Sequence, residues 1–265
     1  MDKSQRTGHN INEMFSSYPK KRPPLPDGYK KIYQAHYIEN REGRSLASAL
    51  STGMERWMHR QMAQDVLPNG SGKSTLEIGA GTLNHLPYEP NTDPYDVIEP
   101  FSRLLEESTQ AHRIRHIYKD LYDIPNGIKY DRILAIATLE HLVDLPRIVA
   151  AAALLLQDSG TFRAATPNEG SWAWALGWNL TTGLEFRLRR GLDYSILLKH
   201  EHVNTAQEIE GVLDYFYDRV ECGFMGLSKT VAFYRSFVCS SPHLDRCTEY
   251  LKSSPEYRES EVRGQ

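Results

Sequence analysis

The strongest constraint on how this chain folds is a short apolar segment that ends in a carboxylate and leads directly into two glycines. It spans residues 74–81, with the sequence STLEIGAG. Glycine lets a ligand come close to the backbone, and Glu77 stands where it could hold a cationic amino group. The pattern predicts a strand, a tight turn and a small-molecule site within a few residues of one another.

Three further apolar segments follow at nearly regular intervals. Residues 95–100 contain Glu99 near their end, residues 113–120 end at Asp120, and residues 130–138 have the composition of a fully buried strand. In nucleoside-binding α/β folds, an acid about 20 residues beyond the glycine turn binds the ribose hydroxyls. Because the carboxyl ends of parallel strands face the ligand crevice, these four strand ends predict a single site.

These residues resemble the class I S-adenosylmethionine-dependent methyltransferases, and the resemblance covers residues 76–166. It implies a Rossmann-like, doubly wound α/β sheet of seven strands in the order 3-2-1-4-5-7-6, with the last strand antiparallel. It also implies S-adenosyl-L-methionine as the cofactor and methyl transfer as the reaction. The chain departs from the family pattern at Leu83, where the third glycine of the motif would stand.

The same resemblance implies which residues contact the cofactor. Gly79 and Gly81 would lie against its methionine part, with Glu77 below the glycine turn. Glu99 would bind the ribose, and Asp120 would face the adenine amino group. The neighbours of these residues and the end of the fourth strand complete the expected cofactor-binding set, which adds Ala80, Pro100, Leu121, Ala137 and Thr138.

Two other nucleotide-binding folds fit the same region less well. Residues 68–75 (PNGSGKST) resemble an ATPase phosphate loop, but Leu67 stands where that loop requires glycine and no apolar strand precedes it. A nicotinamide-binding fold requires Gly-x-Gly-x-x-Gly, and Asn84 stands at the last position. Residues 68–75 are therefore expected to form a solvated turn before the first strand.

Composition limits the classes of partner. The 265 residues can form one α/β core with an added subdomain. With 31 basic and 34 acidic residues, the net charge of −3 gives no support for nucleic-acid binding. No apolar stretch approaches the ~20 residues that span a bilayer. The three cysteines are expected to be reduced thiols. A cytoplasmic protein without a membrane partner is expected, and the sequence is compatible with a homo-oligomer.

The rest of the chain divides into segments by pattern. Residues 1–30 are expected to form a flexible N-terminal arm whose basic run, residues 20–22, is solvated. Residues 31–241 would form the methyltransferase domain, which contains a helical cap at 31–66 and a substrate-binding insertion or lid at 168–204. Residues 242–265 would form a polar C-terminal tail. Within the domain, the patterns predict helices at 145–156 and 205–217 and strands at 160–167, 219–224 and 230–239.

His141 is the candidate catalytic residue. Methyl transfer to a hydroxyl or amine requires alignment of the acceptor and removal of a proton, and an imidazole with a pKa near 6.5 suits that task. The alternative is that His141 begins a helix and packs against the cofactor edge. Residues 138–142 (TLEHL) also resemble O-methyltransferases of ubiquinone biosynthesis, which bind a divalent ion through an added carboxylate. Ala137 stands at that position, so no metal site is expected.

The acceptor is expected to bind beside the insertion. In a strand, His200 and His202 would share one face, and a pocket wall is preferred over a metal site or a solvated loop. The expected acceptor-binding residues are Asn168, Glu169, Trp172, His200, Glu201 and His202. They suit a small polar acceptor such as a sugar or a natural-product intermediate. A protein or RNA methyltransferase and an inactive S-adenosylmethionine-binding protein are the alternatives.

Overall fold

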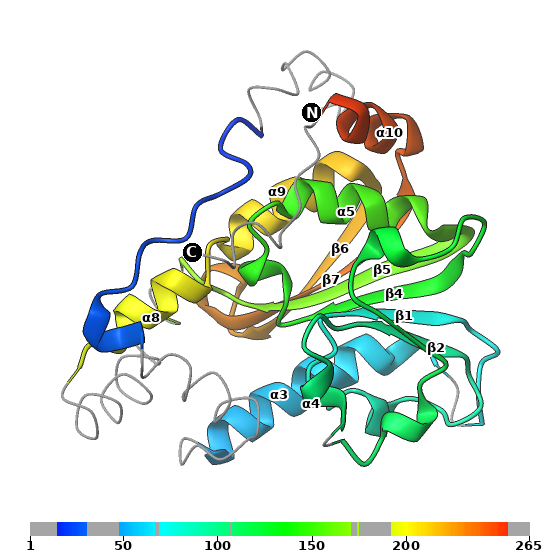
Figure 1. The fold of residues 1–265 in the computed structure, drawn as a ribbon, viewed down its shortest axis with the longest axis horizontal. Helices are drawn as coiled ribbons and strands as arrows, with labels where there is room; N and C mark the ends of the chain where they lie inside the picture. Colours follow the sequence, from blue (N-terminus) through cyan, green and yellow to red (C-terminus); the bar gives the residue numbers. More distant parts are fainter. Residues whose placement is uncertain are drawn as a thin grey trace.

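A seven-stranded sheet forms the centre of the computed structural model, which describes residues 15–30, 48–66, 69–106, 108–170, 174 and 192–253. The strand order is β3-β2-β1-β4-β5-β7-β6 (Figure 1). Neighbours from β3 to β5 pair in parallel, and β7 is antiparallel to both β5 and β6. The predicted order and the predicted antiparallel last strand are confirmed. The strands are β1 (Thr75–Ile78), β2 (Tyr95–Ile98), β3 (His116–Tyr118), β4 (Tyr130–Ile136), β5 (Leu156–Pro167), β6 (Tyr217–Gly226) and β7 (Ala232–Pro242).

Helices cover both faces of the sheet, which explains why β1 and β2 are buried along their whole length and β4 at all but one position. The helices α5, α9 and α10 lie on one face, and α3 and α4 lie on the other (Figure 1). Their bounds are α3 (Ser48–Met62), α4 (Ser102–Glu106), α5 (Leu145–Leu154), α8 (Tyr194–Glu201), α9 (Ala206–Phe216) and α10 (Leu244–Ser253). Short 3₁₀ helices follow several strands: η3 (Leu86–Tyr88), η5 (Leu121–Asp123), η6 (Leu139–His141) and η8 (Lys229–Val231).

Local sequence signals locate these elements closely. Thr205 and Glu208 form the predicted capping box at the start of α9. Pro146 lies in the first turn of α5, where its missing N–H is not needed. The strand predicted at 160–167 begins earlier, at Leu156. Its pairing with β4 shifts register between Tyr130 and Arg132, so residues 157–160 lie between two paired stretches.

The structure corrects the predicted flexible arm over residues 15–30. Phe15 is 6% exposed and stacks on Phe216 of α9, with ring centroids 5.8 Å apart. Tyr29 is also buried. Lys20, expected to be solvated, donates from Nζ to the Val203 carbonyl at 2.8 Å. The segment runs from beside α9 to α8 (blue in Figure 1). Residues 1–14 lie outside the described part of the chain.

The structure also corrects the predicted polar tail, because residues 244–253 form α10. This helix buries Cys247 and Tyr250 against the core that includes α5 and α9. Its remaining positions are mostly polar, so composition alone concealed an amphipathic helix. Residues 254–265 lie outside the described part.

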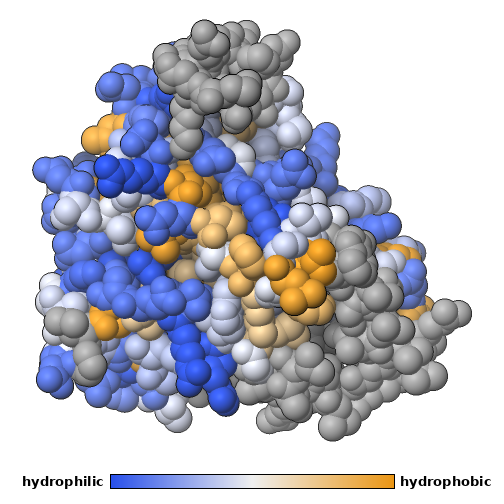
Figure 2. All heavy atoms as spheres, turned by 180° about the vertical axis from the view of Figure 1, so that it is seen from behind, coloured by the Kyte–Doolittle hydropathy of each residue, from blue (hydrophilic) through white to orange (hydrophobic). Residues whose placement is uncertain are grey.

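The cap and the insertion are described in part. Helix α3 lies within the predicted cap, and α8 lies within the predicted insertion. Residues 31–47, 171–173 and 175–191 are not among the described residues, and Trp172 falls there. Among the described helices, none is long and apolar enough to cross a bilayer. On the face turned away from the viewer in Figure 1, the described residues are mainly hydrophilic, with a group of apolar residues near the middle (Figure 2).

Candidate functional site

The turn after β1 brings two strand ends into contact. Gly79 and Gly81 adopt φ values of 73° and 53°, in the left-handed region that favours glycine. A Cβ atom on Gly79 would lie 2.7 Å from both Cγ2 and Oγ1 of Thr138, at the end of β4. Leu83 also has a positive φ, of 66°, and its side chain is buried in a core cluster. Leu83 therefore adopts a left-handed backbone conformation although it is not a glycine.

The carboxylate of Glu99 is held beside this turn. Its Oε2 accepts a hydrogen bond from the Gly81 amide at 2.8 Å, and its Oε1 accepts one from the Phe101 amide at 3.0 Å. The amide of Gly79 donates to the Ile98 carbonyl at 2.8 Å, so the ends of β1 and β2 lie side by side. Glu99 is 2% exposed. The structure thus brings together the glycine turn and the acid predicted to bind ribose.

Asp120 follows the next strand and begins η5. Its Oδ1 accepts from the Tyr122 amide at 3.1 Å, while the Asp120 amide donates to Asp123 at 3.1 Å. Asp120 is half-buried, and Leu121 is buried. Because the Glu99 amide donates to the Tyr118 carbonyl, the ends of β2 and β3 also adjoin. Of the other predicted cofactor contacts, Pro100 and Ala137 are exposed, and Ala80 and Thr138 are buried.

Glu77 lies inside the domain, below the turn. Its Oε2 accepts a hydrogen bond from the Tyr95 hydroxyl at 2.9 Å, and the residue is 3% exposed. Burial raises the pKa of Glu77 to about 8, against the opposing effect of the Tyr95 hydrogen bond. A cationic group of a ligand would have to reach this buried carboxyl, so the role of Glu77 in cofactor binding stays a prediction.

A second group of polar side chains gathers at the carboxyl ends of β4 and β5. Glu140 and His141 belong to η6 after β4, Glu169 follows β5, and Glu201 and His202 lie at the end of α8. The rings of His141 and His202 meet edge to face with centroids 4.6 Å apart. Residues that are about 60 positions apart in the sequence therefore meet at one point of the fold.

Carboxylates and carbonyls orient both imidazoles. His141 Nδ1 donates to the Glu201 carbonyl at 3.1 Å and lies 3.3 Å from Glu201 Oε2. His202 Nδ1 is hydrogen-bonded to Glu169 Oε1. Burial lowers the pKa of His202, but the hydrogen bond and charge of Glu169 outweigh it, so the pKa is raised. Each imidazole is thus held by one ring nitrogen against a fixed oxygen.

Glu140 is the buried member of this group of polar side chains. It is 1% exposed, and Thr166 Oγ1 donates to its Oε2 at 3.1 Å. Burial raises the pKa of Glu140 to about 7. One ligand atom each from Glu140, His141 and His202 lies within 4.8 Å of the others, so these three could ligate an ion, whereas Ala137 adds no ligand. The expectation of no metal site stays a prediction.

Two predicted acceptor residues differ in placement from what the sequence indicated. Residues 200–202 do not form a strand on which the two histidines would share a face: His200 lies on α8, and His202 is its C-cap. His200 Nδ1 donates to the Pro23 carbonyl at 2.7 Å. Asn168 is 1% exposed, and its Nδ2 donates to the carbonyls of Lys229 and Ala232, so it joins the end of β5 to the start of β7.

Sequence reasoning missed two residues that join the walls of this region. Arg22 donates from its guanidinium to the carbonyls of His141, His200 and Glu201. Asn204 donates from Nδ2 to the carbonyls of Leu139 and Leu142 at 2.9 and 2.6 Å. The basic run at 20–22 was the only signal for Arg22. A hydrogen bond to a backbone carbonyl does not depend on the type of the accepting residue, so the sequence does not indicate it.

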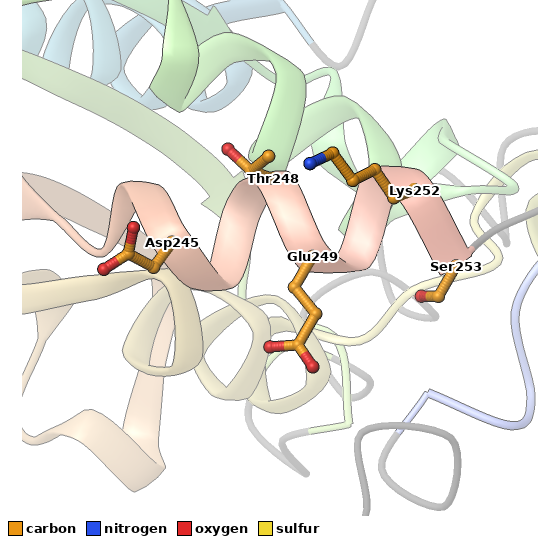
Figure 3. A pocket seen from close by; sticks show the side chains of 5 residues that line it. All are labelled: Asp245, Thr248, Glu249, Lys252 and Ser253. Carbon is orange, nitrogen blue, oxygen red and sulfur yellow. The ribbon is translucent and has the colours of Figure 1, made fainter.

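A surface depression along α10 has no relation to these strand ends. It is lined by Asp245, Thr248, Glu249, Lys252 and Ser253. The side chains point in different directions around one helix and converge on no common point (Figure 3). This depression offers no arrangement for chemistry.

Comparison with known proteins identifies the family. A family model described as a methyltransferase domain matches residues 54–211. The N-methyltransferase NodS from Bradyrhizobium japonicum WM9, solved with S-adenosyl-L-homocysteine, is 17% identical with a TM-score of 0.53, and the match covers 80% of this chain and 98% of NodS. The plantazolicin methyltransferase BpumL, solved with the same compound and a desmethyl plantazolicin analogue, is 13% identical with a TM-score of 0.55, over 87% and 94% of the two chains. No curated protein matches the chain.

The region matched by the family model is more than half of the chain and contains the glycine turn and the ends of β2, β3 and β4. At these identities the solved structures establish the fold alone. The chain therefore belongs to the methyltransferase-domain family and is an S-adenosylmethionine-dependent methyltransferase of the class I fold.

Proposed function

We propose that this enzyme transfers a methyl group from S-adenosylmethionine to a hydroxyl or amine of a small polar acceptor, such as a sugar or a natural-product intermediate. The observation that carries the proposal is the convergence of His141, His202 and Glu169 at the ends of β4 and β5. The amide of His141 donates to the carbonyl of Thr138, whose side chain adjoins Gly79. His141 thus lies one short turn from the proposed cofactor site.

The residues at the first three strand ends fit the cofactor. The left-handed turn at Gly79 and Gly81 leaves backbone atoms without side chains beside a ligand, and Glu99 is a pre-oriented acceptor for ribose hydroxyls. When bound, S-adenosylmethionine supplies an electrophilic methyl group and its own leaving group. The proposed cofactor contacts are Glu77, Gly79, Ala80, Gly81, Glu99, Pro100, Asp120, Leu121, Ala137 and Thr138.

Proton removal would fall to the imidazole group at the end of β4. We assign His141 as the base, because Glu201 holds its Nδ1 and the ring meets His202. Glu169 and His202 would hydrogen-bond the acceptor, together with Glu201 at the same wall. Asn168, Trp172 and His200 remain proposed acceptor residues from the sequence. A cytoplasmic location is also proposed, since Cys222, Cys239 and Cys247 are free thiols.

Binding of S-adenosylhomocysteine tests the cofactor assignment. Calorimetric titration of the full chain should give micromolar affinity for S-adenosylhomocysteine and no binding of ATP-Mg or NAD. Binding of ATP-Mg alone would contradict the roles given to Glu99 and Asp120.

Methyl transfer from labelled S-adenosylmethionine to a panel beginning with sugars and amines tests the acceptor class. With an acceptor found, His141→Ala should lower kcat about 100-fold, because general-base catalysis contributes ~10²–10⁴-fold. Its affinity for S-adenosylhomocysteine should stay unchanged. His112→Ala, at an exposed histidine between β2 and β3, is the control and should keep full activity. Full activity of His141→Ala would leave His141 as a packing residue.

A further inference from the structure

We propose that Arg22 is a positioning residue that holds the two imidazole-bearing segments of the acceptor site together. Its Nη1 donates to the carbonyls of His200 and Glu201 at 2.9 Å each, and its Nη2 donates to the carbonyl of His141 at 2.6 Å. One guanidinium thus bridges the last turn of α8 and the end of η6. The bridging role of Arg22 does not depend on the proposed function, whereas the expected effect of Arg22 on turnover rests on it.

The bonding pattern suits arginine in particular. The last carbonyls of a helix have no partner within the helix, and a cation there also interacts favourably with the helix dipole. The planar guanidinium presents several donors in a fixed fork, so it can bond oxygens from two segments at once. Lysine would retain the charge but lacks that fork.

Arg22 acts on one side of His202, and backbone bonds act on the other. The amides of Val203 and Asn204 donate to the Glu140 carbonyl at 2.8 and 3.1 Å, which fixes the chain after His202. Arg22 fixes the chain before it, at residues 200 and 201. His202 is therefore held between two attachments to the segment that carries Glu140 and His141.

The rest of the N-terminal segment places Arg22 there. Phe15 packs between Phe216 and Tyr250, and at the other end the Tyr29 hydroxyl accepts from the Asp193 amide at 3.0 Å. The Lys20 amide also donates to the Val143 carbonyl at 2.7 Å. The segment is anchored on both sides of Arg22, so the guanidinium is presented at a defined position.

This arrangement fixes the relative position of the imidazoles. The contact of His141 Nδ1 with Glu201 and the edge-to-face contact of the two rings both depend on how η6 and α8 meet. A displacement of about 1 Å in a reacting geometry can lower the rate ~100-fold. Loss of Arg22 should therefore disturb the acceptor site and spare the cofactor contacts at the ends of β1, β2 and β3.

The first test needs no acceptor. Imidazole resonances of the ¹⁵N-histidine-labelled full chain are compared between wild type, Arg22→Met and Lys21→Met, where Lys21 is an exposed cation of the same run. In Arg22→Met we expect shifted or broadened signals of His141 and His202, unchanged signals of His112, and an affinity for S-adenosylhomocysteine within about twofold of wild type. In Lys21→Met all signals should stay unchanged. Unchanged His141 and His202 signals in folded Arg22→Met would overturn the proposal.

If Arg22→Met does not fold, Arg22→Lys replaces it. Intermediate shifts of His141 and His202 would support the bridging fork, and wild-type signals would overturn it. An affinity for S-adenosylhomocysteine that falls together with a general loss of dispersion would assign Arg22 to the fold instead, which also overturns a positioning role.

The second test applies once an acceptor is known. Arg22→Met should lower kcat/KM for the acceptor about 10- to 100-fold, leave the KM for S-adenosylmethionine unchanged, and be partly restored in Arg22→Lys. Wild-type turnover in Arg22→Met would overturn the proposal. Absence of methyl transfer by the wild-type enzyme would instead contradict the proposed function, and the resonance comparison would still decide the role of Arg22.

Discussion

At Gly79 the fold leaves no room for a side chain. We expect Gly79→Ala to weaken S-adenosylhomocysteine binding at least 10-fold, because the added Cβ would meet Thr138 at 2.7 Å and push the turn away from the end of β4. Its left-handed φ would also cost on the order of 1–3 kcal/mol of stability. Gly127→Ala is the matched control: it has a φ of 87°, yet its Cβ would meet nothing within 4 Å. Calorimetry should therefore show weaker binding for Gly79→Ala only. Equal binding by both variants would place Gly79 outside the cofactor site.

At the scale of elements, α10 is part of the core. Tyr250 is 6% exposed and contacts the rings of Phe15 and Phe216 with centroids 5.4 and 5.6 Å apart. We expect Tyr250→Ala to lower the free energy of unfolding by about 3 kcal/mol, because it leaves a cavity between α10, α9 and the N-terminal segment. Glu249→Ala, at an exposed position of the same helix, should change it by less than ~0.5 kcal/mol. Urea denaturation measures both. Equal midpoints would mean that α10 is not packed on the core.

For the whole molecule, buried ionisable groups with shifted pKa values determine the pH range in which the fold is most stable. Burial raises the pKa of Glu77 to about 8, so the folded state holds a proton that the unfolded state releases above about 4.5, and stability falls as pH rises from about 5 to 8. Burial lowers the pKa of His85 to about 4, despite its hydrogen bond to Glu89, so stability is lost as pH falls from about 6.5 to 4. Burial also raises the pKa of Glu140 to about 7, which adds to the loss of stability with rising pH, so we expect maximal stability of the ligand-free protein near pH 5.

Glu77→Gln tests the alkaline side of this profile. The variant keeps an acceptor for Tyr95 but cannot ionise, so its unfolding midpoint should fall less than that of wild type between pH 6 and 8. Below pH 5, both proteins should lose stability alike, because His85 is unchanged. Urea midpoints measured from pH 4 to pH 9 give the comparison. Parallel curves above pH 6 would show that Glu77 does not titrate in this window.

The sequence by itself determined the sheet and the proposed cofactor site, because their signals are local. A buried strand, a glycine turn and an acid at the next strand end are each read within about ten residues, and parallel order follows from their alternation with helices. The capping box of Thr205 and Glu208 was predicted from the sequence for the same reason. Only the tertiary structure decided that His141 meets His202, that Phe15 packs beside Tyr250, and that Arg22 joins η6 to α8. These contacts join segments far apart in the chain, and several use backbone carbonyls, which every residue carries.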